Sequence, residues 1–283
     1  MTVRILTDST CDLPAEVVNQ LEILVLPIYI HVGERDYLDG IDITREEFYS
    51  DLPHYPVHPG TAVPSPAKFH ALYDALADAG ADEVISIHIS SSLSGIIDVA
   101  RTAAQETTST KVTVFDSHQL SLGTGFLVKT AADLAQQGLT ASEILPRLEE
   151  QIKRTHVSAA LSTLTYLRKS GRMNGVISAL GELLSIKPIL TMFDGKAIAE
   201  KVRTQQKAMG RLAEMVRSFA PLERIAFLHS GAVEAAHALK AMLQDVLPDQ
   251  EIWFEMINPV LGAHIGPQAV GFACVSRGEE SSI

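Results

Sequence analysis

The chain has 283 residues, of which 23 are Lys or Arg and 34 are Asp or Glu, so its formal net charge is −11. A chain of this length can form two domains, each with a sizeable core. Its negative charge opposes binding to nucleic acid backbones and to anionic membrane surfaces. We therefore expect no nucleic acid partner and no stable membrane insertion.

The sequence also indicates the cellular compartment and whether a metal or cofactor is expected. The two cysteines, Cys11 and Cys274, are too few for a disulfide framework or a thiolate metal site. Residues 1–10 contain no apolar run behind a basic flank, and no apolar stretch reaches the length of a membrane span. The ten histidines are scattered along the chain. These observations predict a cytoplasmic protein without a metal or cofactor.

Strand and helix patterns alternate through the first half of the chain. Apolar runs predict strands at residues 3–6, 23–32, 84–89 and 111–115. Helices are predicted from Pro14, from Ser65 and over 123–137, and capping boxes at Thr44 and Thr140 indicate two further helix starts. This alternation predicts α/β architecture, with a Rossmann-like parallel sheet wrapped by helices over residues 1–156.

The alternation of strand and helix patterns ends after about His156. Residues 189–193 and 197–202 flank Asp194-Gly195, which predicts a β-hairpin and therefore antiparallel pairing. We also predict helices at 205–219 and 233–246, and strands at 224–228, 251–256 and 271–275. Residues 157–283 are thus expected to form an α+β domain with an antiparallel or mixed sheet. The default ligand site is a cleft between the two domains.

A serine-rich loop is the most informative motif. The strand at 84–89 opens directly into Ser90-Ser91-Ser92-Leu93-Ser94-Gly95, and a helical pattern follows. Open α/β sheets bind ligands at the carboxyl ends of their strands, where hydroxyl and backbone N–H groups attract anions. The loop therefore predicts an anion site. The alternative is that Ser92 or Ser94 acts only as a helix cap.

Two other segments carry groups suited to a carboxyl ligand. Residues 60–65 form a proline-containing loop before a helix, and Thr61 offers a hydroxyl there; the alternative is a turn residue beside an N-cap at Ser65. Residues 262–267 hold His264 among loop-forming residues, and an imidazole is suited to meeting a carboxylate. The alternative for this segment is a structural turn with an incidental histidine.

Two basic groups stand out in this acidic chain. Arg172 lies in the segment 164–175, which is also explained in part by a helix end with Gly171 as its terminator and cations near the C-terminal dipole. Arg203 lies between Lys201 and Lys207 and follows a predicted strand. The two groups suggest a local anion or an acidic partner surface rather than a general positive field.

Ser94 also raises the alternative of an acyl hydrolase or esterase. A Gly-x-Ser-x-Gly frame is absent, because Ser92 and Ile96 occupy the flanking positions. A nucleophilic Ser94 would need a histidine within hydrogen-bond reach of its hydroxyl and an acidic group behind that histidine.

Taken in order, the motifs resemble those of the DegV family of fatty-acid-binding proteins. The similar blocks extend over nearly the whole chain, at residues 7–14, 61–65, 91–95, 116–117, 167–172, 184–190, 202–204 and 262–267. The resemblance implies two α/β domains that hold one long-chain fatty acid, such as palmitate, in a tunnel between them. Its carboxyl group would lie near the surface.

The resemblance also assigns roles to residues. Thr61 and Ser94 would hydrogen-bond the carboxyl group, Gly95 would supply a backbone N–H, and His264 would lie close by. A separate kinase subunit of a bacterial fatty acid kinase system would phosphorylate the bound acid to an acyl phosphate for phospholipid synthesis, docking on Arg172 and Arg203. The chain would then be a lipid-binding carrier and not an enzyme.

The sequence departs from the family pattern at some positions. Ala62 replaces the usual serine, and Ile96-Ile97-Asp98 replaces the usual Thr-Tyr-Gln after Gly95. Thr61 and Ser94 are retained, so the expectation of carboxyl binding stands. A fatty-acid-responsive sensor, whose ligand changes a contact with another protein, remains an alternative to the carrier.

Overall fold

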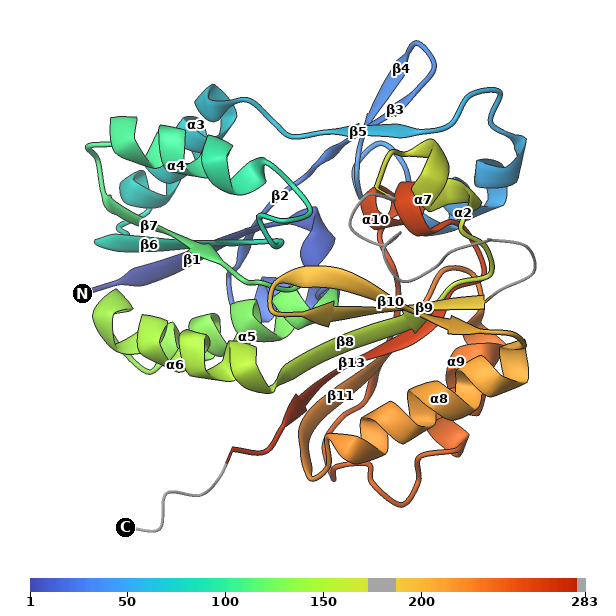
Figure 1. The fold of residues 1–283 in the computed structure, drawn as a ribbon. Coiled ribbons are helices and arrows are strands. Elements are labelled where there is room, and N and C mark those ends of the chain that lie inside the picture. The colour runs from blue at the N-terminus through green and yellow to red at the C-terminus, as the bar shows by residue number, and fades with distance from the viewer. Residues whose placement is uncertain (173–186, 279–283) are drawn as a thin grey trace.

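The computed structural model describes residues 1–172 and 187–278 (Figure 1). A four-stranded sheet in the first half has the strand order β2-β1-β6-β7. Its strands are β1 (Val3–Asp8), β2 (Leu24–Leu26), β6 (Glu83–His88) and β7 (Lys111–Asp116). Each neighbouring pair runs parallel, which confirms the predicted parallel sheet.

Helices cover both faces of this parallel sheet. In Figure 1, α3 (Pro66–Asp78) and α4 (Ile96–Glu106) lie on one face, and α5 (Leu122–Gln136) and α6 (Ala141–Arg154) lie on the other. The short α1 (Ala15–Gln20) follows a 3-10 turn at Ser9–Cys11. The helix starts predicted at Ser65 and Thr140 are confirmed, since these residues are the N-caps of α3 and α6.

A six-stranded sheet occupies the second half, in the order β10-β9-β8-β13-β11-β12. Its strands are β8 (Thr155–Ala160), β9 (Lys187–Phe193), β10 (Lys196–Val202), β11 (Leu222–His229), β12 (Trp253–Met256) and β13 (Val270–Ser276). Only β11 and β12 pair parallel, so the sheet is mixed, as predicted. Helices α8 (Gln205–Ser218) and α9 (Val233–Ala241) pack on its outer face (Figure 1).

Helix α5 joins the two halves, because it contacts both sheets. Glycines near its start permit this close packing. A Cβ atom at Gly123 would lie 2.5 Å from a methyl group of Val157 on β8, and one at Gly125 would lie 2.4 Å from the carbonyl oxygen of Cys11. Both distances are too short for real side chains, so Gly123 permits the close contact of α5 with β8 and Gly125 permits its close contact with the segment that follows β1.

Several predicted boundaries are wrong. The single strand predicted at 23–32 is interrupted at Pro27, which cannot donate a ladder hydrogen bond. Its first part is β2, and its second part is β3 (Tyr29–Val32), which belongs to a third sheet with β4 (Arg35–Leu38) and β5 (Gly60–Ala62). The helix predicted at 233–246 ends earlier, at Ala241.

The remaining short helices lie near the third sheet. They are α2 (Arg45–Asp51), a 3-10 turn at Leu52–His54, α7 (Thr165–Lys169) and α10 (Pro259–Ile265). The predicted capping box at Thr44 is confirmed at the start of α2, where the Glu47 backbone N–H donates to Thr44 Oγ1 over 3.2 Å. Helix α10 packs on α2, α7, β3 and β5, so a segment from the end of the chain completes this region.

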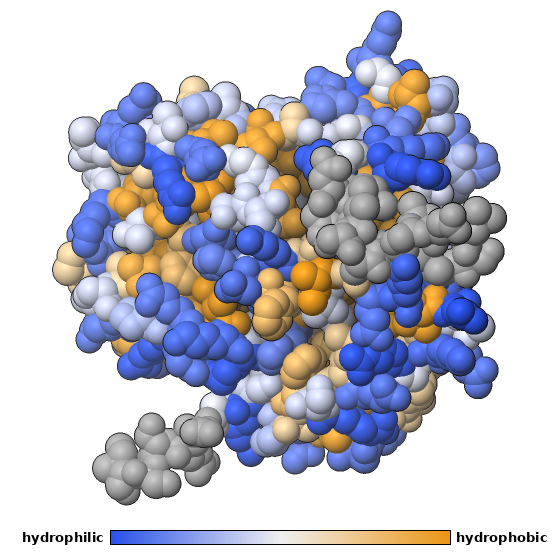
Figure 2. Space-filling model, in the orientation of Figure 1, coloured by the Kyte–Doolittle hydropathy of each residue, from blue (hydrophilic) through white to orange (hydrophobic). Residues whose placement is uncertain are grey.

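The surface carries mixed polar and apolar groups (Figure 2). An apolar patch near the centre of the view coincides with the β9–β10 hairpin of Figure 1, where Phe193 is 68% and Ile198 is 47% exposed. Among the described helices, none is long and apolar enough to cross a membrane.

Candidate functional site

The serine-rich loop lies at the carboxyl end of β6, as predicted. Gly95 is the N-cap of α4, so the loop connects strand to helix directly. Neighbouring loops hold it in place. The Ser90 N–H donates to the Gln119 carbonyl over 2.8 Å, and the Ser91 N–H donates to a carboxylate oxygen of Asp116 over 3.2 Å. The loop backbone is therefore held by the segment that follows β7.

Thr61 lies on a strand, which corrects the prediction of a loop over residues 60–65. It belongs to β5 and pairs with Ile30 of β3 in an antiparallel register. The prediction of Ser65 as an N-cap is confirmed by position, although its side chain makes no capping hydrogen bond. Strand pairing fixes the backbone around Thr61 more firmly than a loop would.

His264 lies on α10, so the predicted loop at 262–267 is also wrong in part. Helix α10 begins after Asn258, whose side-chain oxygen accepts a hydrogen bond from the Leu261 N–H over 2.9 Å. Gly262 is required on this helix because a Cβ atom there would lie 2.5 Å from the hydroxyl oxygen of Tyr49. Gly262 is thus needed for helix packing. Of the two glycines in this segment, only Gly266 has a positive φ, of 76°.

These elements enclose a cavity of about 750 Å³, which lies within the size range of small-molecule sites. Thr61, Ser94, Gly95, His264 and Arg172 all line it, although they come from four separate parts of the chain. Most other lining side chains are apolar: Ile28, Ala62, Val63, Ile89, Leu93, Ile96, Leu120, Leu167, Leu190, Ala197, Ile198, Val260, Leu261 and Ile265. The cavity therefore combines an apolar interior with a small number of polar groups.

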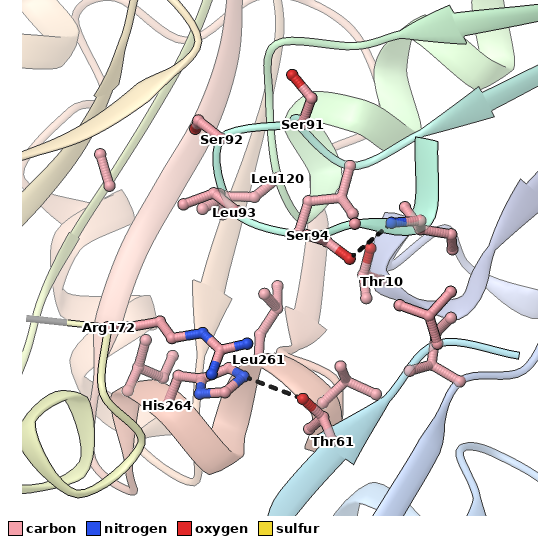
Figure 3. Close-up of a pocket in the computed structure, with 18 of the residues that line it drawn as sticks. Thr10, Thr61, Ser91, Ser92, Leu93, Ser94, Leu120, Arg172, Leu261 and His264 are labelled. Carbon is pink, nitrogen blue, oxygen red and sulfur yellow. Dashed lines mark hydrogen bonds between the residues drawn. The ribbon is translucent and has the colours of Figure 1, made fainter. Parts of the chain in front are cut away.

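Three of the polar side chains, those of Thr61, His264 and Arg172, gather near one another (Figure 3). Thr61 Oγ1 lies 3.4 Å from Nε2 of His264, and the side chains of Arg172 and His264 lie side by side in this view. The Ser94 hydroxyl accepts a hydrogen bond from the Ile96 N–H over 3.3 Å and lies beside Thr10 in this view. This end of the cavity can receive an acceptor group such as a carboxyl oxygen.

His264 is neutral at pH 7. Burial, with smaller contributions from the nearby charges of Arg172 and His58, lowers the pKa of its imidazole to about 4. Within the described chain, Nδ1 of His264 is buried without a hydrogen-bond partner. A neutral imidazole can donate at one ring nitrogen and accept at the other, so it can meet a carboxyl group in either protonation state.

A smaller apolar hollow of about 60 Å³ adjoins the cavity. The two share the side chains of Leu120, Leu190, Ala197, Leu261 and Ile265. The hollow continues between β8, β9 and β11, where Val157, Met192 and Leu228 line it. An elongated apolar ligand can extend in this direction from the polar end.

The two arginines predicted for partner docking occupy different places. Arg172 is exposed, donates to the Ser170 carbonyl over 3.0 Å and lines the cavity. Arg203 follows β10, as predicted, is exposed and does not line the cavity. Gly171 has a φ of 73° after α7, which confirms it as a helix terminator. Residues 173–175 of the predicted basic segment and 184–186 of the family-like block lie outside the described residues.

Sequence reasoning missed part of the cavity wall. Asp8 and Thr10 line the cavity, and the Thr10 N–H donates to Oδ1 of Asp8 over 3.0 Å. On its other side, Oδ2 of Asp8 lies 2.8 Å from Nδ1 of the fully buried His88, whose Nε2 lies 2.7 Å from the Ser86 hydroxyl. The sequence shows that Asp8 is a polar residue at the end of a predicted strand. No sequence pattern indicates that its buried partner is His88, 80 residues later.

Ser94 lacks the surroundings of a hydrolase nucleophile. Among the described residues, no histidine nitrogen lies within hydrogen-bond distance of its hydroxyl. The histidine that lines the same cavity, His264, contacts Thr61 instead. The arrangement therefore gives no support to the acyl hydrolase alternative.

Comparison with known proteins gives a family match over almost the whole chain. A family model described as "Uncharacterised protein, DegV family" matches residues 2–277. A DegV domain-containing protein of Deinococcus radiodurans is 38% identical over 278 residues, which cover 96% of this chain and 98% of that protein. The match thus includes every element that lines the cavity.

Solved structures give the same result for the fold. A DegV family protein from Thermus thermophilus, described as fatty acid binding, has a TM-score of 0.90 at 34% identity and covers 98% of this chain and 100% of its own. DegV from Bacillus subtilis, described as a fatty acid binding protein, has a TM-score of 0.88 at 30% identity and covers 97% and 99%.

Proposed function

Because the chain belongs to the DegV family, we propose that its cavity binds one long-chain fatty acid and that the protein presents the carboxyl group to a separate kinase. The observation that carries the proposal is the cavity itself, in which an apolar interior meets hydroxyl and imidazole groups at one end. In this proposal residues 1–156 and 157–283 are the two domains, and the ligand lies between them.

The apolar interior supplies the affinity. Burying a saturated chain contributes roughly 0.8 kcal/mol per methylene group, so a dozen buried carbons contribute on the order of 10 kcal/mol. This exceeds the cost of immobilising a flexible ligand over much of its estimated range. The apolar side chains from both halves of the chain provide such an environment, and the adjoining hollow near Met192 would take the methyl end of the ligand.

The polar end supplies the orientation. Thr61 and Ser94 would donate their hydroxyl hydrogens to the carboxyl group, with the Gly95 N–H and His264 beside them. Because burial keeps His264 neutral, this residue places no positive charge beside the carboxyl group. Arg172 lies at the same end. Arg172 and Lys196 are the two cations of the described cavity lining, and either can attract an anionic group.

Protein purified from a bacterial host is expected to contain fatty acid in near-stoichiometric amount, because an enclosed apolar site releases its ligand slowly. Solvent extraction followed by mass spectrometry measures this content. A parallel extraction of buffer is the control. Extracts that match the buffer, together with failure to bind added palmitate after delipidation, would overturn the proposed function.

Presentation to the kinase is expected to depend on Arg203. This residue is exposed and lies outside the cavity lining, so Arg203→Glu should leave fatty acid affinity unchanged. It should lower acyl phosphate formation by the cognate kinase at least ten-fold, since like charges at a docking surface cost several kcal/mol. The assay contains purified kinase, ATP and lipid-loaded protein.

The matched control is Arg147→Glu, an equal charge change at an exposed position of α6. It should leave kinase turnover at the wild-type rate. Arg172→Glu is less informative by itself because Arg172 lines the cavity and its reversal acts on binding as well. Normal turnover with Arg203→Glu would remove the docking role of this residue, whereas acyl ester hydrolysis without kinase would favour the hydrolase alternative.

A further inference from the structure

The β9–β10 hairpin forms one wall of the cavity. Strand β10 is the edge strand of the six-stranded sheet, and β9 is its strand partner. Lys196, Ala197 and Ile198 of β10 line the cavity directly. An edge hairpin is held to the sheet on one side only, so contacts at its tip decide how firmly it covers the cavity.

The tip of the hairpin is attached to the serine-rich loop. Gly195 is buried, although its neighbours Asp194 and Lys196 are exposed. Its carbonyl oxygen accepts two hydrogen bonds, one from the Ser90 hydroxyl over 2.6 Å and one from the Ser92 hydroxyl over 2.5 Å. One carbonyl thus connects the hairpin to the loop that also carries Ser94.

Sterics restrict the tip to glycine. Gly195 has a φ of 71°, and a Cβ atom at this position would lie 2.4 Å from Nδ1 of His118. His118 is held in turn by its backbone N–H, which donates to Asp116 over 2.9 Å. Asp116 also accepts a hydrogen bond from the Ser91 N–H. The same carboxylate therefore holds both the serine-rich loop and the His118 backbone next to Gly195.

We propose that this contact is a clasp and that the β9–β10 hairpin is the gate through which the ligand enters and leaves. Ser90 and Ser92 are positioning residues that hold the hairpin closed through Gly195. The proposal rests on the proposed function, since the passing ligand is the fatty acid. It assigns to the serine-rich loop two separate tasks, with Ser94 at the carboxyl group and Ser92 at the gate.

The two tasks differ in their kinetic consequences. Figure 3 shows Ser92 on a different side of the loop from Ser94 and Thr61. If the clasp has the same free energy in the empty and in the loaded protein, it does not contribute to the Kd of the ligand. Weakening it raises the population of the open state in both, so association and dissociation accelerate together. A residue that binds the ligand changes the affinity instead.

The test measures association and dissociation rates of a fluorescent long-chain fatty acid with the delipidated full chain. Ser92→Ala should raise both rates about five-fold, the effect of one lost hydrogen bond, with Kd unchanged. Ser50→Ala is the matched control, because Ser50 is exposed on α2, lies outside the cavity lining, and its hydroxyl makes no hydrogen bond within the described residues. Ser92→Thr keeps the hydroxyl and should restore the wild-type rates.

Gly195→Ala is the second variant, and it should raise both rates more than Ser92→Ala because it displaces the tip from His118. Its control is Gly210→Ala on α8, where nothing lies near the added methyl group. Unchanged rates in both Ser92→Ala and Gly195→Ala, in a protein that binds the fatty acid normally, would refute the gate alone. A raised Kd with an unchanged association rate would also refute it, and absence of binding by the wild-type protein would refute the proposed function as well.

Discussion

Thr61→Val and Ser94→Ala are each expected to weaken fatty acid binding by about 1–3 kcal/mol, because each removes a hydroxyl while nearly preserving shape. The carboxyl group of the ligand would then remain buried without one of its donors. The variant with both substitutions should bind least tightly. Titration of delipidated protein with palmitate, followed by calorimetry or fluorescence, measures the difference.

A comparison of ligands sharpens this experiment. The wild-type protein should bind palmitate more tightly than the corresponding alcohol, and the double variant should lose most of that preference. Thr113→Val on β7 and Ser50→Ala on α2 are matched controls, since both residues lie outside the cavity lining and neither hydroxyl makes a hydrogen bond within the described residues. Equal palmitate affinity in the double variant and the wild type would place the carboxyl group elsewhere.

Asp12→Ala is expected to lower the free energy of unfolding by about 3–5 kcal/mol, the cost of removing one partner of a buried ion pair. Asp12 is 1% exposed. One of its carboxylate oxygens accepts hydrogen bonds from the Asn258 N–H and side-chain amide over 2.9 and 3.0 Å, and it lies 3.2 Å from the Arg45 guanidinium. The other accepts the Ser121 hydroxyl over 2.6 Å.

The contacts of Asp12 also connect stability to the site. Asn258 caps α10 with its side-chain oxygen while its amide donates to Asp12, so the carboxylate orients the residue from which α10 begins. That helix carries His264 at the polar end of the cavity. Loss of Asp12 should therefore loosen the position of His264 in addition to weakening the fold.

Urea unfolding monitored by circular dichroism measures the effect of Asp12→Ala. Asp12→Asn tests the charge separately, because asparagine keeps the shape and tolerates the left-handed backbone, where φ is 56° at this position. Asp98→Ala is the control, since Asp98 is exposed and its only ion pair within the described residues is a 3.8 Å surface contact with Arg101. A change as small for Asp12→Ala as for Asp98→Ala would contradict the stabilising role.

The sequence by itself determined the local elements and their order. The capping box at Thr44 was visible because the groups that satisfy a helix start lie within four residues of one another. The Asp194-Gly195 hairpin and the serine-rich loop at the end of β6 were visible for the same reason. Alternating strands and helices in one half, followed by a hairpin in the other, were sufficient to predict parallel and mixed sheets.

Only the tertiary structure decided which of these elements meet. Thr61 and His264 lie 203 residues apart in the chain, and no local pattern records that β5 and α10 pack together. The third sheet, the buried Asp8–His88 contact and the clasp on Gly195 also depend on side chains distant in sequence. Such contacts form because the core must bury its apolar faces and pair its polar groups, and that requirement acts on the folded chain as a whole.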